Sequence, residues 1–253
     1  MRTVRDFYNY LDEIAPFSAA EKWDNSGLLV GSFEKEVERV AVVLDLNKET
    51  LDQAISLEAD LIITHHPVIF KAQKTFLSDC LAYKLAENSI GLIATHTPLD
   101  CADGGVNDVL CDLLELTKVE ILSLSESENL IRVGFTDRTT PNDFARFVSR
   151  QLSADVRFCD GEKEIETVAV CSGAGADFAR EIAELGIDAF VTGDAKYHDF
   201  LDAKEEGLTL IAAGHFETEN PAMAILASKL RGNFSETDII VLSETNPIKY
   251  LKD

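Results

Sequence analysis

Apolar and polar positions along the first half of the chain predict strands and helices in regular succession. Residues 39–46 (RVAVVLDL), 60–64 (DLIIT) and 91–95 (GLIAT) are short apolar runs typical of buried strands. Residues 48–58 and 77–88, which lie between these runs, have the spacing of helices. Short apolar strands separated by helices favour a mainly parallel sheet with helices on both faces.

The second half repeats this rhythm after a polar segment, residues 117–129, that ends in a Ser/Glu cluster. We therefore expect an α/β fold with two lobes, residues 1–125 and 126–253, and leave open whether the C-terminal segment returns to the first lobe. The last predicted helix has Pro221 near its start and Gly232 at its end. The further predicted strands are 130–136, 167–173, 188–194, 208–214 and 237–243, and the further helices are 106–116, 142–152, 175–185 and 221–232.

Neither the N-terminus nor any later segment predicts a membrane protein. Residues 1–17 alternate apolar and polar positions and lack the apolar core of a signal peptide. No run approaches the roughly 20 apolar residues that cross a bilayer. The five cysteines are odd in number and form no CxxC pair, which argues against a disulfide framework. We expect a cytoplasmic protein.

The net charge of −22 narrows the range of partners. Binding to a nucleic-acid backbone requires a basic face, so direct binding to DNA or RNA is not expected. We interpret most of the acidic residues as a solvated surface that keeps the protein soluble. A small-molecule substrate remains compatible with this charge, and only a local cluster of ligands would specify a metal.

Polar residues capable of binding metal follow the predicted strands. His65 and His66 directly follow the run 60–64, and two adjacent histidines at a strand end can diverge to reach two ions. His96 follows the run 91–95 in the same way. A carboxylate can bridge two cations, and spacing alone allows either Asp100 or Asp103, the latter also being a turn or cap residue before a helix.

Two further clusters follow strands of the second half. His215 and Glu219 are four residues apart and share a face if their segment is helical. The segment Thr192–His198 could contribute a base that contacts a metal ligand, or it could bind an anionic substrate through Lys196. The alternative for this segment is a helix start with Asp194 as its N-cap.

Six motifs in order give the chain a resemblance to a known family over nearly its whole length. They are WDNSGLLVG at 23–31, ITHHPVIF at 63–70, THTPLDCADGGVND at 95–108, SGAGADF at 172–178, VTGDAKYH at 191–198 and GHFETE at 214–219. The sequence resembles the dinuclear-metal proteins named after a yeast Ngg-one-interacting factor three, whose members carry the name GTP cyclohydrolase 1 type 2 homologue.

This resemblance implies two similar α/β lobes with two divalent metal ions between them, and a ring-shaped homohexamer. It assigns Asp100, not Asp103, as the bridging carboxylate, and it places this chain among the compact members that lack an inserted domain. The ligand chemistry is compatible with Zn, Mn and Fe. The implied ligands are His65, His66, Asp100, His215 and Glu219.

A two-metal site predicts a hydrolase, and the resemblance suggests GTP or a related nucleotide as the substrate. His96 is the candidate for proton transfer, and Lys196 and His198 are candidates for substrate binding. Two alternatives remain open at this point. One is a metal-binding or metal-delivery protein without catalysis that interacts with a protein partner, and the other is a metal-dependent phosphoesterase.

Overall fold

The computed structural model describes residues 1–125, 127 and 129–251, and the chain divides into two compact units. The first unit contains Met1–Gly105 and Ala222–Pro247, and the second contains Val106–Pro221 and the segment from Ile248 onward. The lobe boundary expected between residues 125 and 126 involves residue 126, which lies outside the described residues. The chain leaves the first unit after Gly105, returns to it after Pro221, and leaves it again after Pro247. The return takes place within the helix α9 (His215–Asn233).

The first unit is built on a five-stranded sheet with the order β13-β4-β5-β6-β2. Its central strands pair in parallel, and only β2 is antiparallel to its neighbour. A separate antiparallel pair joins β1 to β3. The strands are β1 (Arg2–Thr3), β2 (Gly27–Val30), β3 (Glu36–Val37), β4 (Arg39–Val43), β5 (Leu61–Thr64), β6 (Gly91–Ala94) and β13 (Asp238–Val241).

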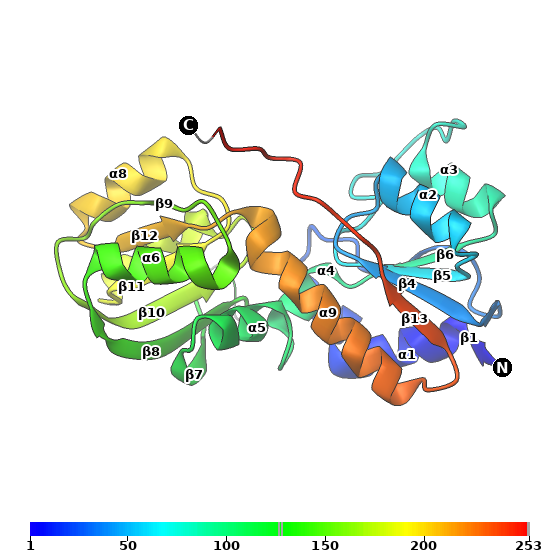
Figure 1. Ribbon diagram of the computed structural model, residues 1–253, viewed down its shortest axis with the longest axis horizontal. Helices are drawn as coiled ribbons and strands as arrows, with labels where there is room; N and C mark the ends of the chain where they lie inside the picture. Colours follow the sequence, from blue (N-terminus) through cyan, green and yellow to red (C-terminus); the bar gives the residue numbers. More distant parts are fainter. Residues whose placement is uncertain (126, 128, 252–253) are drawn as a thin grey trace. The chain divides into compact units, whose positions relative to one another are not determined.

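Helices cover the two faces of this sheet (Figure 1). Leu51 of α2 and Leu85 of α3 pack on one face, in a buried cluster with Ile62 of β5. On the opposite side, Phe7 of α1 stacks on Phe234 with ring centroids 4.1 Å apart. The helical segments are α1 (Val4–Ile14), the 3₁₀ turn η1 (Phe17–Ala19), α2 (Lys48–Ser56), α3 (Leu81–Glu87) and α4 (His96–Cys101).

The second unit contains a six-stranded sheet with the order β7-β8-β10-β11-β12-β9. The strands β10, β11 and β12 are parallel, and the outer strands pair antiparallel. Its strands are β7 (Thr117–Leu122), β8 (Ile131–Thr139), β9 (Arg157–Phe158), β10 (Ile165–Cys171), β11 (Ala189–Thr192) and β12 (Thr209–Ala212).

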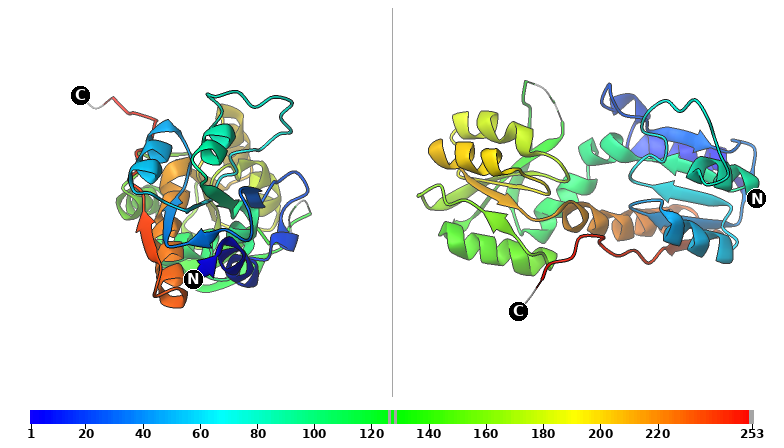
Figure 2. Two further views of the ribbon diagram at one scale, coloured as in Figure 1. Left: turned by 90° about the vertical axis from the view of Figure 1, so that its right-hand side faces the viewer. Right: turned by 90° about the horizontal axis from the view of Figure 1, so that it is seen from above.

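This sheet also has a buried cluster on each face. Phe144 and Val148 of α6 pack against Val168 on one face, and Ile182 of α7 packs against Phe190 on the other. Figure 2 shows α6 and α8 on opposite sides of these strands. The helical segments are α5 (Val106–Leu113), α6 (Pro141–Leu152), the 3₁₀ turn η2 (Ala176–Phe178), α7 (Ala179–Glu184) and α8 (Tyr197–Glu205).

The α/β fold with helices flanking both sheets confirms the prediction from periodicity, but several elements differ from it. The strands β2 and β9 and the helix α4 were not predicted. The helix expected to start at Pro221 is α9 (His215–Asn233), and Pro221 lies inside it. Residues 117–122, predicted to be a polar linker, form the edge strand β7, whose residues are mostly exposed. An exposed edge strand needs no apolar periodicity, which explains why the pattern missed it.

The parallel strands bring their carboxyl ends to one edge of each sheet. In the first unit Val43↔Thr64 and Thr64↔Ala94 are paired, so the residues after β4, β5 and β6 emerge together. In the second unit Cys171↔Thr192 and Thr192↔Ala212 are paired in the same way. Open α/β sheets bind their ligands at these edges. Among the described residues, no helix has the length and apolar character needed to cross a membrane.

Candidate metal centre

His65 and His66 directly follow β5, and hydrogen bonds to the backbone at the end of β4 hold both residues. The amide of His65 donates to the carbonyl of Val43 at 3.2 Å, and the amide of His66 donates to Leu44 at 3.1 Å. His65 is fully buried and His66 is half-buried. Their ring centroids are 4.9 Å apart, with an angle of 52° between the planes. The two imidazoles therefore lie side by side at one strand end and are tilted relative to one another.

His96 joins this pair from the next strand. It opens α4 directly after β6, and its ring centroid lies 5.2 Å from that of His65 and 5.4 Å from that of His66. One ring nitrogen from each of the three histidines lies within 4.8 Å of the others. The first unit thus contains a histidine group that could hold a metal ion.

Asp100 lies one helical turn after His96 and also faces the group. Its side chain is almost fully buried, and Oδ1 is 3.6 Å from Nε2 of His65. Asp103 is exposed and lies beyond the end of α4. Of the two acids that spacing left open, the structure places Asp100 beside the histidines.

Asp24 holds His96 in place. Its Oδ1 is 2.8 Å from Nδ1 of His96, and its Oδ2 accepts from the hydroxyl and the amide of Thr97 at 2.6 and 3.2 Å. Burial of the carboxyl would raise its pKa, but hydrogen bonds from His96 and Thr97 outweigh burial and hold the pKa of Asp24 well below its usual value. Asp24 is therefore a charged carboxylate that fixes one nitrogen of His96.

Asp45 has the same relationship to His66. Its Oδ1 lies 2.8 Å from Nδ1 of His66. The backbone at this position is anchored by Glu244, which follows β13 and whose carboxylate accepts from the amides of Leu44 and Asp45 at 3.2 Å. Burial, and the nearby charge of Asp45, raise the pKa of Glu244 to about 7 despite these hydrogen bonds.

His215 and Glu219 lie together in the second unit, on the first turns of α9. The Nε2 of His215 is 3.2 Å from Oε2 of Glu219, and its Nδ1 is 2.7 Å from Oδ2 of Asp194. Burial would lower the pKa of His215, but its hydrogen bonds and charge interactions with Glu219 and Asp194 raise the pKa to about 9. The predicted sharing of a helix face is confirmed within this unit.

Gly173 and Gly193 leave room for the side chains of His215 and Glu219, because they have no Cβ atom. A Cβ on Gly173 would lie 2.2 Å from Oε1 of Glu219 and 3.1 Å from Nε2 of His215, and the residue has a φ of +60°. A Cβ on Gly193 would lie 2.8 Å from the Cα of His215. The loops after β10 and β11 therefore require glycine at the points where they pass His215 and Glu219.

The structure contradicts the interpretation that Asp194, in the segment after β11, is the N-cap of the next helix. The N-cap of α8 is Lys196, whose amide donates to Asp199 at 2.6 Å, so Asp194 is not the cap. Asp194 instead contacts His215. Lys196 and His198, the candidates for substrate binding, are exposed at the start of α8, and His198 contacts the ring of Tyr197.

Three histidines thus share one arrangement that sequence analysis found only in part. Nδ1 of His66, His96 and His215 each lies within hydrogen-bonding distance of an aspartate, which in each case comes from a distant part of the sequence. Histidines that bind metal commonly have this second contact, which fixes the tautomer and presents Nε2 to the ion. Asp24 and Asp45 were missed because nothing in their local sequence indicates which histidine they reach.

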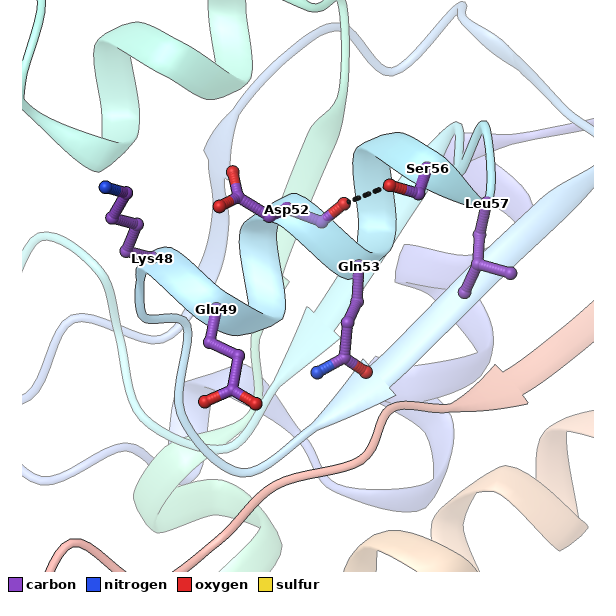
Figure 3. Close-up of a pocket in the computed structure, with 6 residues that line it drawn as sticks. All are labelled: Lys48, Glu49, Asp52, Gln53, Ser56 and Leu57. Carbon is purple, nitrogen blue, oxygen red and sulfur yellow. Dashed lines mark hydrogen bonds between the residues drawn. The ribbon is translucent and has the colours of Figure 1, made fainter.

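The hollow shown in Figure 3 does not belong to these groups. The residues that line it come from α2 and its C-cap, and they are Lys48, Glu49, Asp52, Gln53, Ser56 and Leu57. Gln53 exchanges hydrogen bonds with the backbone of Ser243, which fastens the segment after β13 to α2. One helix alone forms the hollow, and we assign it no binding role.

Fold and site together define a class of protein with two α/β units whose strand ends present histidines and carboxylates suited to divalent metal. The profile of the Duf34/NIF3 (NGG1p interacting factor 3) family matches residues 2–247. The chain belongs to this family.

Relatives and solved structures agree with this assignment. A protein of Clostridium acetobutylicum named GTP cyclohydrolase 1 type 2 homolog is 33% identical over 263 aligned positions, covering 98% of both chains. The Staphylococcus aureus hypothetical protein SA1388 has a TM-score of 0.90 and 29% identity, covering 98% of this chain and 99% of its own. Reduced HcgD from Methanocaldococcus jannaschii has a TM-score of 0.85 and 26% identity, covering 96% and 98%.

Proposed function

We propose that this protein is a metal-dependent hydrolase that holds two divalent ions and acts on a nucleotide, with GTP as the first candidate. The ions would be Zn, Mn or Fe, all of which accept imidazole and carboxylate ligands. The family resemblance extends the proposal to a homohexamer in the cytoplasm. The proposed ligands are His65, His66, Asp100, His215 and Glu219.

The observation that carries the proposal is the contact between Nδ1 and a carboxylate at His66, His96 and His215, at 2.7 to 2.8 Å. A histidine that serves only to fill a core needs no charged partner on one nitrogen. With Nδ1 occupied, the tautomer is fixed and Nε2 is directed to a ligand. The donor set of imidazole nitrogen and carboxylate oxygen fits a transition metal better than it fits Ca²⁺ or Mg²⁺.

Divalent ions held by these residues would supply Lewis acidity, which activates water and polarises an electrophile. The residues of the chain supply orientation and proton transfer. His96 is fixed by Asp24 and stands beside His65 and His66, which suits it to move a proton through Nε2. Lys196 and His198 remain candidates for contacting the anionic part of a substrate, since both are exposed.

Turnover on a panel of nucleotides tests the proposal. Protein stripped of metal and reloaded separately with Zn, Mn and Fe is incubated with each common nucleotide, and its metal content is measured by elemental analysis. Products are followed by chromatography beside Asp100→Asn, which removes one charge from the ligand set. We expect about two ions per chain and turnover well above that of the variant.

The products separate the functions. Formate with a ring-opened or pterin product indicates cyclohydrolase chemistry, whereas phosphate or pyrophosphate indicates a phosphoesterase. Metal that binds and exchanges without any turnover would replace the hydrolase by a metal-binding or delivery protein. Failure to bind metal under every loading condition would overturn the proposal.

A further inference from the structure

Two exposed aromatic rings stand beside the histidine group of the first unit. Trp23 is 56% exposed and Phe70 is 45% exposed, although large aromatic side chains are normally buried. The ring centroids are 5.8 Å apart, and they lie 5.6 and 6.2 Å from the ring of His96. The three rings therefore form a triangle of contacts, and both Trp23 and Phe70 keep surface that a ligand can reach.

The backbone under these rings is anchored. Asp24, the residue after Trp23, binds His96 and Thr97, and the amide of Glu21 donates to the hydroxyl of Thr97 at 3.0 Å. The side chain of Asn25 donates to the carbonyl of Ile69 at 2.6 Å, which ties the loop of Trp23 to the loop of Phe70. The two rings are therefore preorganised, which lowers the entropic cost of binding a ligand between or upon them.

The charge near Phe70 differs from that of the whole chain. The protein has 45 acidic and 23 basic residues, yet residues 61–78 contain Lys71 and Lys74 and no acidic residue. Both lysines are exposed. A loop free of acidic residues next to open aromatic rings favours a ligand that is planar at one end and anionic at the other.

From these observations we infer that Trp23 and Phe70 form a stacking site for the planar heteroaromatic ring of a nucleotide-like ligand, with Lys71 close to its anionic group. This inference deepens the proposed function by placing the base beside His96. Stacking on aromatic side chains tolerates many bases because each has a π face. The site would thus set the class of substrate, while its fine specificity comes from other contacts.

The chain contains a single tryptophan, so its fluorescence reports this site directly. The full-length protein, both metal-free and metal-loaded, is excited where tyrosine does not absorb and titrated with GMP, guanosine and ribose 5-phosphate. Free N-acetyltryptophanamide corrects for absorption by the ligand. We expect saturable quenching by GMP and guanosine, tighter binding of GMP, and no response to ribose 5-phosphate.

Variants locate the effect. Phe70→Ala is expected to weaken binding of GMP about tenfold, as stacking contributions of this kind imply, and Phe70→Tyr to retain it. Tyr83→Ala, which removes an exposed ring from α3, is the matched control and should leave binding unchanged. Lys71→Gln should abolish the difference between GMP and guanosine. Since every variant position is exposed, none of these changes should unfold the protein.

Absence of saturable quenching in both metal states, or unchanged binding by Phe70→Ala, would overturn the inference. A blue-shifted emission spectrum of Trp23 that does not change on addition of ligand would also overturn the inference, because the indole would then be covered by protein. The readout needs no turnover. Quenching without turnover rejects the hydrolase while retaining the stacking site, and turnover without quenching does the reverse.

Discussion

The carboxylate of Asp24 lies 2.8 Å from Nδ1 of His96, 72 residues further along the chain. The same carboxylate accepts hydrogen bonds from Ser26 and Thr97, and its side chain is fully buried. A buried carboxylate with this many donors is a fixed negative charge. A loop between η1 and β2 thus decides how a histidine at the end of β6 is oriented.

Replacing this charge should slow proton transfer by His96 without removing a proposed metal ligand. Asp24→Asn retains the shape and an acceptor oxygen but loses the charge that favours a basic Nε2 on His96. We expect turnover by metal-loaded protein to fall about 10–100-fold while its metal content stays that of the parent protein. Product chromatography and elemental analysis measure the two quantities. Asp103→Asn, at an exposed acid near the same helix, is the control, and equal turnover by both variants would contradict the prediction.

Removing a proposed ligand should release metal and preserve the fold. His66→Ala alters a side chain just after β5 and Asp100→Ala one in the short helix α4, and neither residue belongs to the apolar clusters. We expect both to lose most bound metal while the circular dichroism spectrum stays that of the parent protein. A variant that unfolds yet keeps its metal would mean that the residue is structural.

Gly173 offers a test with a matched backbone control. A Cβ there would lie 2.2 Å from Oε1 of Glu219, whereas Gly186, with a φ of +77°, has no atom within 4 Å of an added Cβ. Alanine at either position costs about 1–2 kcal/mol of stability, because both require positive φ. Only Gly173→Ala should also disturb Glu219 and His215.

Elemental analysis and denaturant unfolding of the two alanine variants separate these effects. We expect metal loss in Gly173→Ala and normal metal content in Gly186→Ala. The free energy of unfolding should fall further in Gly173→Ala, because its Cβ also overlaps Glu219. Normal metal content in both would argue against Glu219 as a ligand.

The raised pKa of Glu244 leads us to expect that the free energy of unfolding depends on pH. Burial raises its pKa from 4.5 to about 7 in the folded protein, so folding favours the protonated form. Its contribution is fully present below pH 4.5 and is lost as the pH rises to about 7. The change amounts to about 1–3 kcal/mol, since one pKa unit corresponds to about 1.4 kcal/mol.

Glu244→Gln keeps an acceptor for the amides of Leu44 and Asp45 but cannot ionise. Between pH 5 and pH 8, the free energy of unfolding of the parent protein should therefore fall relative to that of this variant, by about 1–3 kcal/mol. Urea unfolding of metal-free protein at a series of pH values measures the difference. Parallel pH profiles would show that Glu244 has the same pKa in the folded and unfolded chains.

The sequence by itself determined most of the regular elements and the position of the candidate ligands along them. The buried strands β4, β5 and β6 are apolar on both faces, so each appears as a short continuous run and the polar residues that end it are conspicuous. His65, His66 and His96 could be placed at strand ends for this reason. The spacing of His215 and Glu219 likewise indicated a shared helix face.

Only the tertiary structure decided which distant residues meet these histidines. Asp24 lies outside any strand or helix, and Asp45 and Asp194 follow β4 and β11 without a pattern of their own. Spacing could not choose between Asp100 and Asp103, because the choice depends on where α4 ends. Periodicity reports burial along one element. The pairing of a carboxylate with an imidazole instead depends on sheet order and loop path, which bring separate elements together.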